Sequence, residues 1–315
     1  MTRKIVLERV KANENVGSGL AHPRDKASSK APSHEGIRFR VLTHNIRYAT
    51  SAPFKGEERW PIRRPLLCSE LAFHSNDPAT FICLQEVLHS QLADIMQTLN
   101  ETANSGKWAY IGVGRDDGMT AGEYSPILYR PDVWKLTKWD TCWLSPTPRV
   151  PSKGWDAAST RIATIGHFIH SQTGHKVIIT TTHFDDQGVV SRKHSAELIL
   201  EVLDFEAGFA GASATILTGD FNSPPDDQAY KIMTAPGSIM ADVADIVPKE
   251  LHYGNEMTFS GFSADSAPSR IDFIFTKKQD MVEFGSYGVL ANRFDDGVYI
   301  SDHRACVTDV NLLPN

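Results

Sequence analysis

Two short polar motifs in the C-terminal half of the chain contain residue types that could hydrolyse an ester. Gly219-Asp220-Phe221-Asn222 follows an apolar run at 214–218, and Ser301-Asp302-His303 precedes a second run at 305–310. Asp220 and Asn222 are two residues apart at a strand end, so their side chains point to the same side of a sheet. A histidine beside a carboxylate can be held in one tautomer and can titrate near neutral pH. Together these groups predict a metal-assisted hydrolytic site.

The elements that must position these motifs are strands alternating with a few helices. Helical spacing predicts helices at 61–74, at 90–99 with Ser90 as its cap, and at 191–205. The pattern predicts a hairpin formed by 125–129 and 133–143, and further strands at 38–44, 80–84, 161–169, 176–182, 214–218, 270–276 and 305–312. Because helices flank strands without a regular βαβ alternation, we expect an α+β fold with two packed sheets.

The motifs spread over residues 37–315, where no internal repeat and no clear linker interrupts the chain. This distribution predicts one catalytic domain over 37–315. Residues 11–36 are rich in Lys, Ala, Ser, Pro, Gly and Asn, and the segment 1–36 is expected to form a mobile leader or strap.

The composition is that of an ordinary globular protein. The chain has 315 residues, 41% of them hydrophobic and 22% charged, and a formal net charge of −6. An acidic balance disfavours tight nonspecific binding to duplex nucleic acid without excluding it. No apolar run approaches the roughly 18 residues of a membrane span, and the N-terminus lacks the apolar core of a secretion signal. We therefore expect a cytoplasmic or otherwise soluble protein, with its four cysteines as buried thiols.

Six strand-end motifs occur in a fixed order along the chain: Thr43-His44-Asn45, Leu84-Gln85-Glu86-Val87, Thr182-His183-Phe184-Asp185, Gly219-Asp220-Phe221-Asn222, Arg270-Ile271-Asp272-Phe273-Ile274 and Ser301-Asp302-His303. This series resembles the endonuclease/exonuclease/phosphatase superfamily over about residues 37–312, in particular its small freestanding microbial-type members. The resemblance implies the deoxyribonuclease-I-like fold, in which two packed mixed β-sheets are flanked by helices as a four-layer α/β-β/α sandwich.

The resemblance also implies a role for each motif residue. The implied metal ligands are Asn45, Glu86 and Asp302, with Mg²⁺ or Mn²⁺ as the ion that suits hard oxygen donors. The implied catalytic residues are His183, Asp220, Asn222, Asp272 and His303, among which Asp272 orients His303 and the Asp220/Asn222 pair positions water and phosphate.

Further residues are expected to contact the substrate or to support those that do. The resemblance implies that Arg161 contacts phosphate and that Glu123 supports His183. Trp143 and Trp155, with Trp60, could form an aromatic wall that stacks on a base or sugar or covers an apolar ligand.

Each of these residues also has a plain structural interpretation. Asp220 and Asn222 could belong to a turn, His183 could be a satisfied structural histidine, and Arg161 could pair with a surface acid. Asp185 and Asp186 could form a solvated turn, and the tryptophans could only anchor loops. The charges of the predicted helices are expected on solvated faces, namely Arg63, Arg64, Arg192 and Lys193. Glu86 has few structural alternatives, because a buried carboxylate needs partners.

The leading hypothesis is a Mg²⁺-dependent phosphoesterase that acts on a small or medium-sized phosphate ester by in-line attack of water. The alternatives are a nuclease on DNA or RNA, a scaffold recruited to specialised metabolism, and a silent binding module on the same fold. A sphingomyelinase-type lipid phosphodiesterase ranks lower, because no amphipathic or long apolar insertion is evident. The residues fit a phosphomonoester and a phosphodiester equally, fit one metal ion or two, and carry no information on the oligomeric state.

Overall fold

The computed structural model describes residues 36–102, 106–263 and 265–314. Apart from Gly36, the predicted leader at 1–36 lies outside the described residues. Of the helices in the described ranges, none combines the length and apolar character needed to cross a membrane.

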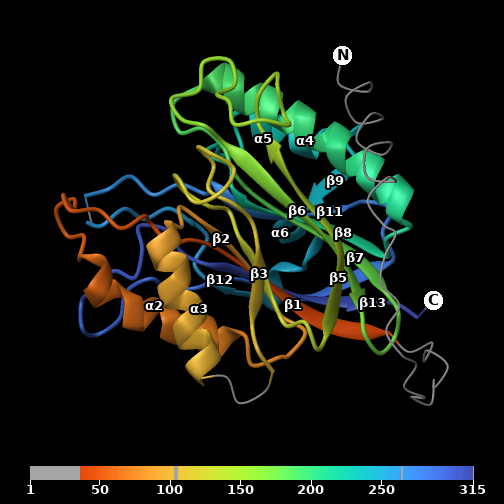
Figure 1. Cartoon of the computed structure of the whole chain (residues 1–315), viewed down its shortest axis with the longest axis horizontal. Helices are drawn as coiled ribbons and strands as arrows, with labels where there is room; N and C mark the ends of the chain where they lie inside the picture. Colours follow the sequence, from red (N-terminus) through yellow and green to blue (C-terminus); the bar gives the residue numbers. More distant parts are fainter. Residues whose placement is uncertain (1–35, 103–105, 264, 315) are drawn as a thin grey trace.

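Two mixed β-sheets form the centre of the molecule (Figure 1). The seven-stranded sheet has the order β10 (His252–Gly254), β12 (Val282–Val289), β13 (Cys306–Leu312), β1 (Ile37–Asn45), β2 (Phe81–Gln85), β4 (Ile127–Tyr129) and β3 (Ala109–Ile111). The six-stranded sheet has the order β5 (Trp134–Trp143), β6 (Ile162–His170), β7 (Lys176–His183), β8 (Ala214–Asp220), β11 (Asp272–Lys277) and β9 (Met240–Asp242).

Helices cover the outer faces of both sheets. In Figure 1, α2 (Trp60–His74) and α3 (His89–Thr102) lie on one side of the strands, and α4 (Val189–Ala210) and α5 (Gln228–Thr234) lie on the other. The short α6 (Val243–Ile246) and the 3₁₀ helix η1 (Lys249–Leu251) connect β9 to β10. The predicted four-layer sandwich is therefore confirmed.

Side-chain alternation along the strands separates three hydrophobic layers. In β2, Phe81 and Cys83 pack between the two sheets, whereas Ile82 and Leu84 pack toward α2 and α3. In β8, Ile216 faces the layer between the sheets and its neighbour Leu217 faces the layer beneath α4 and α5. A strand that is buried on both faces has a continuous run of apolar residues. These strands could therefore be predicted from the sequence. All four cysteines are buried and free, as expected.

Two local predictions need correction, and one long strand was missed. Residues 125–129 and 133–143 do not form a hairpin, because β4 belongs to the seven-stranded sheet and β5 to the six-stranded one. The chain crosses between the sheets at 130–133. Helix α3 begins at His89, so Ser90 lies inside the helix and does not cap it. Strand β12 was not predicted, because its residues alternate between half-buried and exposed over 282–286 and include two glycines.

The strand pairing brings the polar strand ends to one edge of the sandwich. In the six-stranded sheet, parallel pairing of β7 and β8 places His183 beside Asp220, and antiparallel pairing of β11 with β8 places Asp272 opposite Asp220. In the seven-stranded sheet, β1 and β2 are parallel and end together at Asn45 and Gln85. Strand β13 is antiparallel to β1 and enters at this same edge, directly after the His303 motif.

Candidate active site

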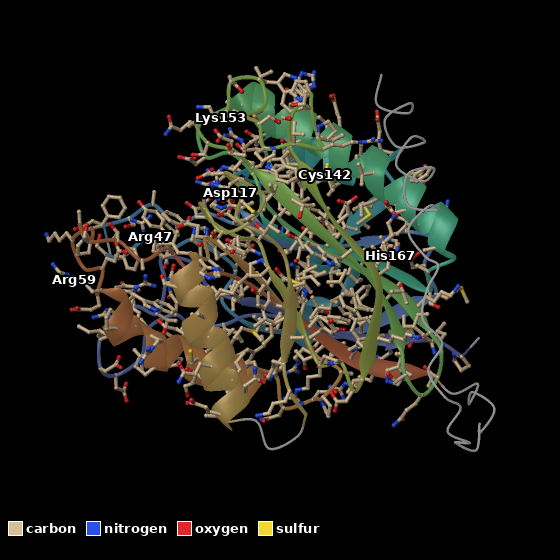
Figure 2. All side chains as sticks on the ribbon, in the orientation of Figure 1. Arg47, Arg59, Asp117, Cys142, Lys153 and His167 are labelled. Carbon is tan, nitrogen blue, oxygen red and sulfur yellow. The ribbon has the colours of Figure 1, made fainter. Side chains whose placement is uncertain are left out.

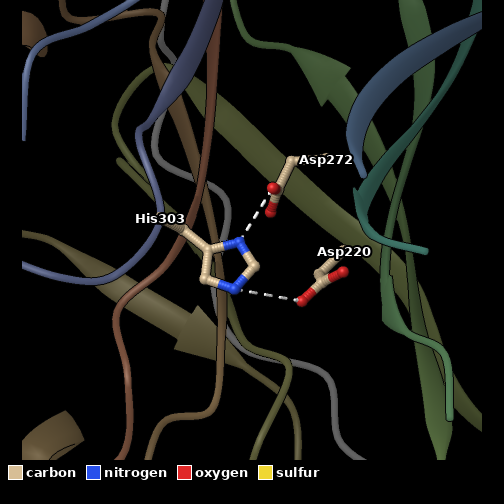
Figure 3. Close-up of side chains that lie close together, drawn as sticks. All are labelled: Asp220, Asp272 and His303. Atoms are coloured by element: carbon tan, nitrogen blue, oxygen red, sulfur yellow. Dashed lines mark hydrogen bonds and ion pairs between the residues drawn. The ribbon is translucent and has the colours of Figure 1, made fainter. Parts of the chain in front are cut away.

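His303 lies between two carboxylates at this edge (Figure 3). Its Nδ1 donates to Asp272 Oδ2 at 2.8 Å, and its Nε2 faces Asp220 Oδ2 at 3.6 Å. All three side chains are buried, with exposures of 4%, 1% and 1%. Burial alone would lower the pKa of His303, but the charges of Asp272 and Asp220 and the hydrogen bond to Asp272 raise it well above its usual value. The geometry therefore stabilises His303 as a cation.

Asp220 is the residue around which the other side chains meet. Its Oδ2 accepts a hydrogen bond from Asn45 Nδ2 at 2.9 Å, and its Oδ1 accepts one from the backbone N–H of Asn222 at 2.8 Å. Burial, with the nearby charge of Asp272, raises the pKa of Asp220 to about 7. A carboxyl group with such a pKa can exchange a proton near neutral pH.

Glu86 lies next to Asn45 on the neighbouring strand end. Asn45 Nδ2 donates to Glu86 Oε1 at 3.0 Å, and the backbone N–H of Tyr48 donates to Glu86 Oε2 at 3.1 Å. Glu86 has a φ of 58°, a left-handed conformation that is uncommon for a residue with a side chain. Such strain persists where surrounding structure enforces it, and it concentrates at functional sites.

The end of strand β8 depends on a glycine. Gly219 has a φ of 143°, and a Cβ at this position would overlap the backbone carbonyl of Thr182 on the neighbouring strand. The absence of a side chain lets β7 and β8 approach closely enough to hold His183 beside Asp220.

The acidic residues of this edge suit a hard divalent cation. Burial raises the pKa of Asp302, and the nearby negative charge of Glu86 raises it further. The positive charges around these two carboxylates therefore do not fully compensate their repulsion. Glu86, Asp302 and the Asn45 amide offer oxygen donors, which Mg²⁺ and Mn²⁺ prefer. A second group, Asp220, Asp272 and His303, has ligand atoms within 4.8 Å of one another and could also hold a metal ion.

His183 lies on the other side of Asp220 in a different electrostatic environment. Its Nε2 is 3.5 Å from Asp220 Oδ2 and accepts from Asn222 Nδ2 at 3.1 Å. Its Nδ1 is 3.8 Å from Glu123 Oε2. Burial, followed by the positive charges of Arg161 and Arg115, lowers the pKa of His183 well below its usual value. His183 is therefore held neutral.

Arg161 is anchored by the pair Asp185 and Asp186. Its Nε is 3.3 Å from Asp185 Oδ2, and its Nη2 donates to Asp186 Oδ1 at 2.6 Å. Asp185 is fully buried and accepts hydrogen bonds from the backbone N–H groups of Ala158 and Ser159. The interpretation of Asp185 as part of a solvated turn is therefore wrong.

The three tryptophans occupy separate environments. Trp143 is buried, and its indole N–H donates to the carbonyl of Arg115 at 2.8 Å. Trp60 is buried against Asp94, to which its indole N–H donates at 2.8 Å. Trp155 is 40% exposed and stacks on His194 of α4 at 4.7 Å. Contact of Trp143 and Trp155 with a substrate stays a prediction. Through its hydrogen bond to the Arg115 carbonyl, Trp143 supports the loop that carries Arg115.

Sequence reasoning misplaced one buried arginine of α2. Arg63 is 0% exposed, and its Nη1 donates at 2.8 Å to the carbonyls of both Ile46 and Ile300. It therefore ties the segment after Asn45 to the segment before Asp302. Arg192 is likewise buried and donates to the carbonyl of Asp185, so neither arginine lies on a solvated face.

Sequence reasoning also missed Arg47, two residues after Asn45. Its backbone N–H donates to Asn45 Oδ1 at 3.0 Å, and its Nη1 is 3.8 Å from Glu86 Oε2. Figure 2 labels Arg47 and Asp117 toward the end of the sandwich that carries the site, with His167 well away from both. The signal that could have identified Arg47 is its position directly after a strand-end motif.

Two mixed sheets with a carboxylate and imidazole cluster at one shared edge define the deoxyribonuclease-I-like class of fold. The model of the endonuclease/exonuclease/phosphatase family matches residues 42–303, and the chain belongs to this family. Its members are hydrolases that act on phosphate esters.

Known structures and sequences agree with this assignment. A mannosyl-6-phosphatase from Bacteroides thetaiotaomicron is 32% identical, with a TM-score of 0.75 over 86% of this chain and 99% of that one. A family protein from Bacteroides vulgatus is also 32% identical, with a TM-score of 0.75 over 88% of this chain and 99% of that one. Nocturnin from Drosophila melanogaster is 25% identical over 96% of this chain and 51% of its own length, so the chain spans about half of that relative.

Proposed function

We propose that residues 37–315 act as one catalytic domain, a Mg²⁺- or Mn²⁺-dependent phosphoesterase for a small or medium-sized phosphate ester. The observation that carries the proposal is the set of side chains around Asp220. Asn45, His183 and His303 all lie within 3.6 Å of Asp220 Oδ2, although they come from strand ends of both sheets. The similarity to a mannosyl-6-phosphatase supports a small substrate.

Glu86, Asn45 and Asp302 are the proposed ligands of the cation. The other candidate metal-binding group consists of Asp220, Asp272 and His303. It is less suited to an ion, because His303 and Asp272 already share a hydrogen bond of 2.8 Å that occupies one ligand atom of each. A bound divalent cation would neutralise negative charge that develops on the phosphoryl oxygens.

The remaining side chains accept the proton of the attacking water, position that water and stabilise the negative charge that develops. Asp220, with its pKa raised to about 7, orients the attacking water and takes its proton. Asn222 donates through Nδ2 to the carbonyl of Phe184 at 3.0 Å and to His183 Nε2 at 3.1 Å, which leaves its Oδ1 to accept a hydrogen bond from the attacking water. Cationic His303, oriented by Asp272, donates a hydrogen bond to a phosphoryl oxygen on which negative charge develops during in-line attack.

The test is a panel of esters assayed with Mg²⁺, Mn²⁺, Ca²⁺ and EDTA. It contains p-nitrophenyl phosphate, bis(p-nitrophenyl) phosphate, hexose 6-phosphates and a single-stranded oligonucleotide. We expect metal-dependent release of phosphate or nitrophenol from the small esters, and its loss in Glu86→Ala. The matched control is Asp226→Asn on the exposed side of the turn after β8, which should keep full activity. No metal-dependent hydrolysis of any ester would contradict the proposal.

A further inference from the structure

Arg115 lies beside the site in the segment between β3 and β4, and its side chain is 13% exposed. Its Nη1 donates to Glu123 Oε2 at 2.6 Å, which fixes the guanidinium near His183. The backbone of Arg115 is held independently, because its N–H donates to the Glu123 carbonyl at 3.0 Å and its own carbonyl accepts from Trp143. The side chain can therefore be replaced without removing the contacts that fold this segment.

Arg161 approaches His183 from another segment, at the start of β6. Its side chain is 5% exposed, and its Nη1 is buried without a hydrogen-bond partner among the described residues. Arg115 Nε also makes no hydrogen bond among these residues, although Asp116 Oδ1 lies 3.9 Å from it. A buried donor without a partner costs free energy, which an anionic ligand would recover. Two guanidinium groups with unused donors therefore lie near one neutral histidine.

The two arginines, each paired with carboxylates of its own, lie next to the acidic group of the site. Glu123, which holds Arg115, is close enough to Glu86 for their charges to interact, so the arginine side adjoins the proposed cation ligands. A phosphoryl group that contacts both would have some of its oxygens at the cation that Glu86, Asn45 and Asp302 would hold and others near Arg115 and Arg161. The planar fork of a guanidinium matches two oxygens of a phosphate.

We infer that Arg115, together with Arg161, makes the site selective for phosphomonoesters over phosphodiesters. This inference rests on the proposed phosphoesterase function. A phosphomonoester carries two negative charges on three terminal oxygens near neutral pH, whereas a diester carries one charge on two. The guanidinium of Arg115 can bind the third oxygen and the second charge, which only the monoester has. Arg115 is thus a specificity-determining residue, placed by Glu123 and Trp143.

The experiment compares kcat/KM for p-nitrophenyl phosphate and bis(p-nitrophenyl) phosphate in the wild type and in Arg115→Gln. We expect the variant to lose about 10- to 100-fold on the monoester and less than about threefold on the diester. Arg115→Lys keeps the charge without the fork and should lie between the wild type and Arg115→Gln. Arg64→Gln is the matched control, because Arg64 on α2 forms an exposed pair with Asp94 on α3 and its replacement should change neither rate.

The outcomes separate this inference from the function on which it rests. If the wild type hydrolyses neither ester with any metal, the phosphoesterase proposal fails. If the wild type is active but Arg115→Gln lowers both rates equally, or lowers neither, only the role of Arg115 is overturned. A wild type that hydrolyses the diester alone would also overturn it. A weaker inhibition by inorganic phosphate in Arg115→Gln, with an unchanged melting temperature, would support the role.

Discussion

His303 and His183 lie on either side of Asp220, at 3.6 and 3.5 Å from the same carboxylate oxygen, and both are buried. Their pKa values nevertheless shift in opposite directions. Asp272 bonds to His303 and stabilises its cation, whereas His183 faces arginines and accepts a hydrogen bond from Asn222. Burial is thus common to both, and the charge of the neighbour decides which histidine is protonated.

This difference gives the two histidines separate tasks. A cationic imidazole stabilises negative charge on a phosphoryl group. A neutral one near Arg115 and Arg161 adds no third positive charge beside the two guanidinium groups. The proposed mechanism therefore divides the site into a proton-handling half around His303 and an anion-recognising half around His183.

Removing the carboxylate shared by the two histidines should have the largest effect. Asp220→Asn keeps the shape of the side chain and most hydrogen bonds but cannot take a proton from water. We expect kcat on p-nitrophenyl phosphate to fall about 1,000-fold with the fold intact. Asp226→Asn serves as the control, and a loss below tenfold would show that Asp220 is not the base.

Asp272→Asn should remove the cause of the high pKa of His303. Because Asp272 raises the pKa of His303, replacing Asp272 should lower this pKa. His303 should then lose its extra proton at a lower pH. We expect kcat to fall about 10- to 100-fold and the alkaline limb of the pH profile to move to lower pH. An alkaline limb that stays in place would separate Asp272 from the protonation of His303.

Asp185→Asn should weaken the support of Arg161 and change the pH dependence of stability. Burial alone would raise the pKa of Asp185, but hydrogen bonds from backbone N–H groups and the charge of Arg161 lower it to about 2. A lowered pKa stabilises the fold above the ordinary carboxyl pKa of about 4, and this contribution disappears as the pH falls toward 2.

Chemical denaturation from pH 7 to 2.5 measures this effect. The wild type should be about 2 kcal/mol more stable than Asp185→Asn at neutral pH, with the gap closing in acid. Asp186→Asn provides the comparison, because the Asp186 side chain is 49% exposed and should matter less. A gap that does not vary with pH would refute the assigned role of the Asp185 charge.

Arg161→Gln should bring the two histidines closer in behaviour. The charge of Arg161 helps to lower the pKa of His183, so its removal should raise that pKa toward the ordinary histidine value while leaving His303 unaffected. Titration of the ring resonances by NMR follows each histidine separately. An unchanged His183 pKa would mean that burial alone keeps it neutral.

The proton-handling half was readable in the sequence. In the anion-recognising half, the family resemblance implied roles for His183, Arg161 and Glu123 but none for Arg115. Asp220, Asp272 and His303 adjoin strands buried on both faces, whose apolar runs are unmistakable and whose ends meet at one edge. Arg115 lies in a loop without hydrophobic periodicity, and only tertiary contacts place it by Glu123. Hydrophobic patterning positions strand ends but says nothing about where loops return.

Two further failures have the same physical cause. The segment at 125–143 reads as a hairpin because adjacent strands usually pair, yet its halves join different sheets across the core. Arg63 looks like a helix surface charge, but its guanidinium is satisfied inside the protein by four backbone carbonyls, those of Ile46, Arg47, Glu58 and Ile300. Burial of a charge depends on partners remote in sequence, which local patterns do not report.

The most direct test of the account is the protonation state of the two histidines in the metal-free protein, measured at pH 7 from ¹⁵N chemical shifts of the imidazole rings. We predict that His303 carries protons on both ring nitrogens and that His183 carries one, on Nδ1, with Nε2 accepting from Asn222. Two rings that titrate together near the ordinary histidine pKa would contradict the division of the site into a charged and a neutral half.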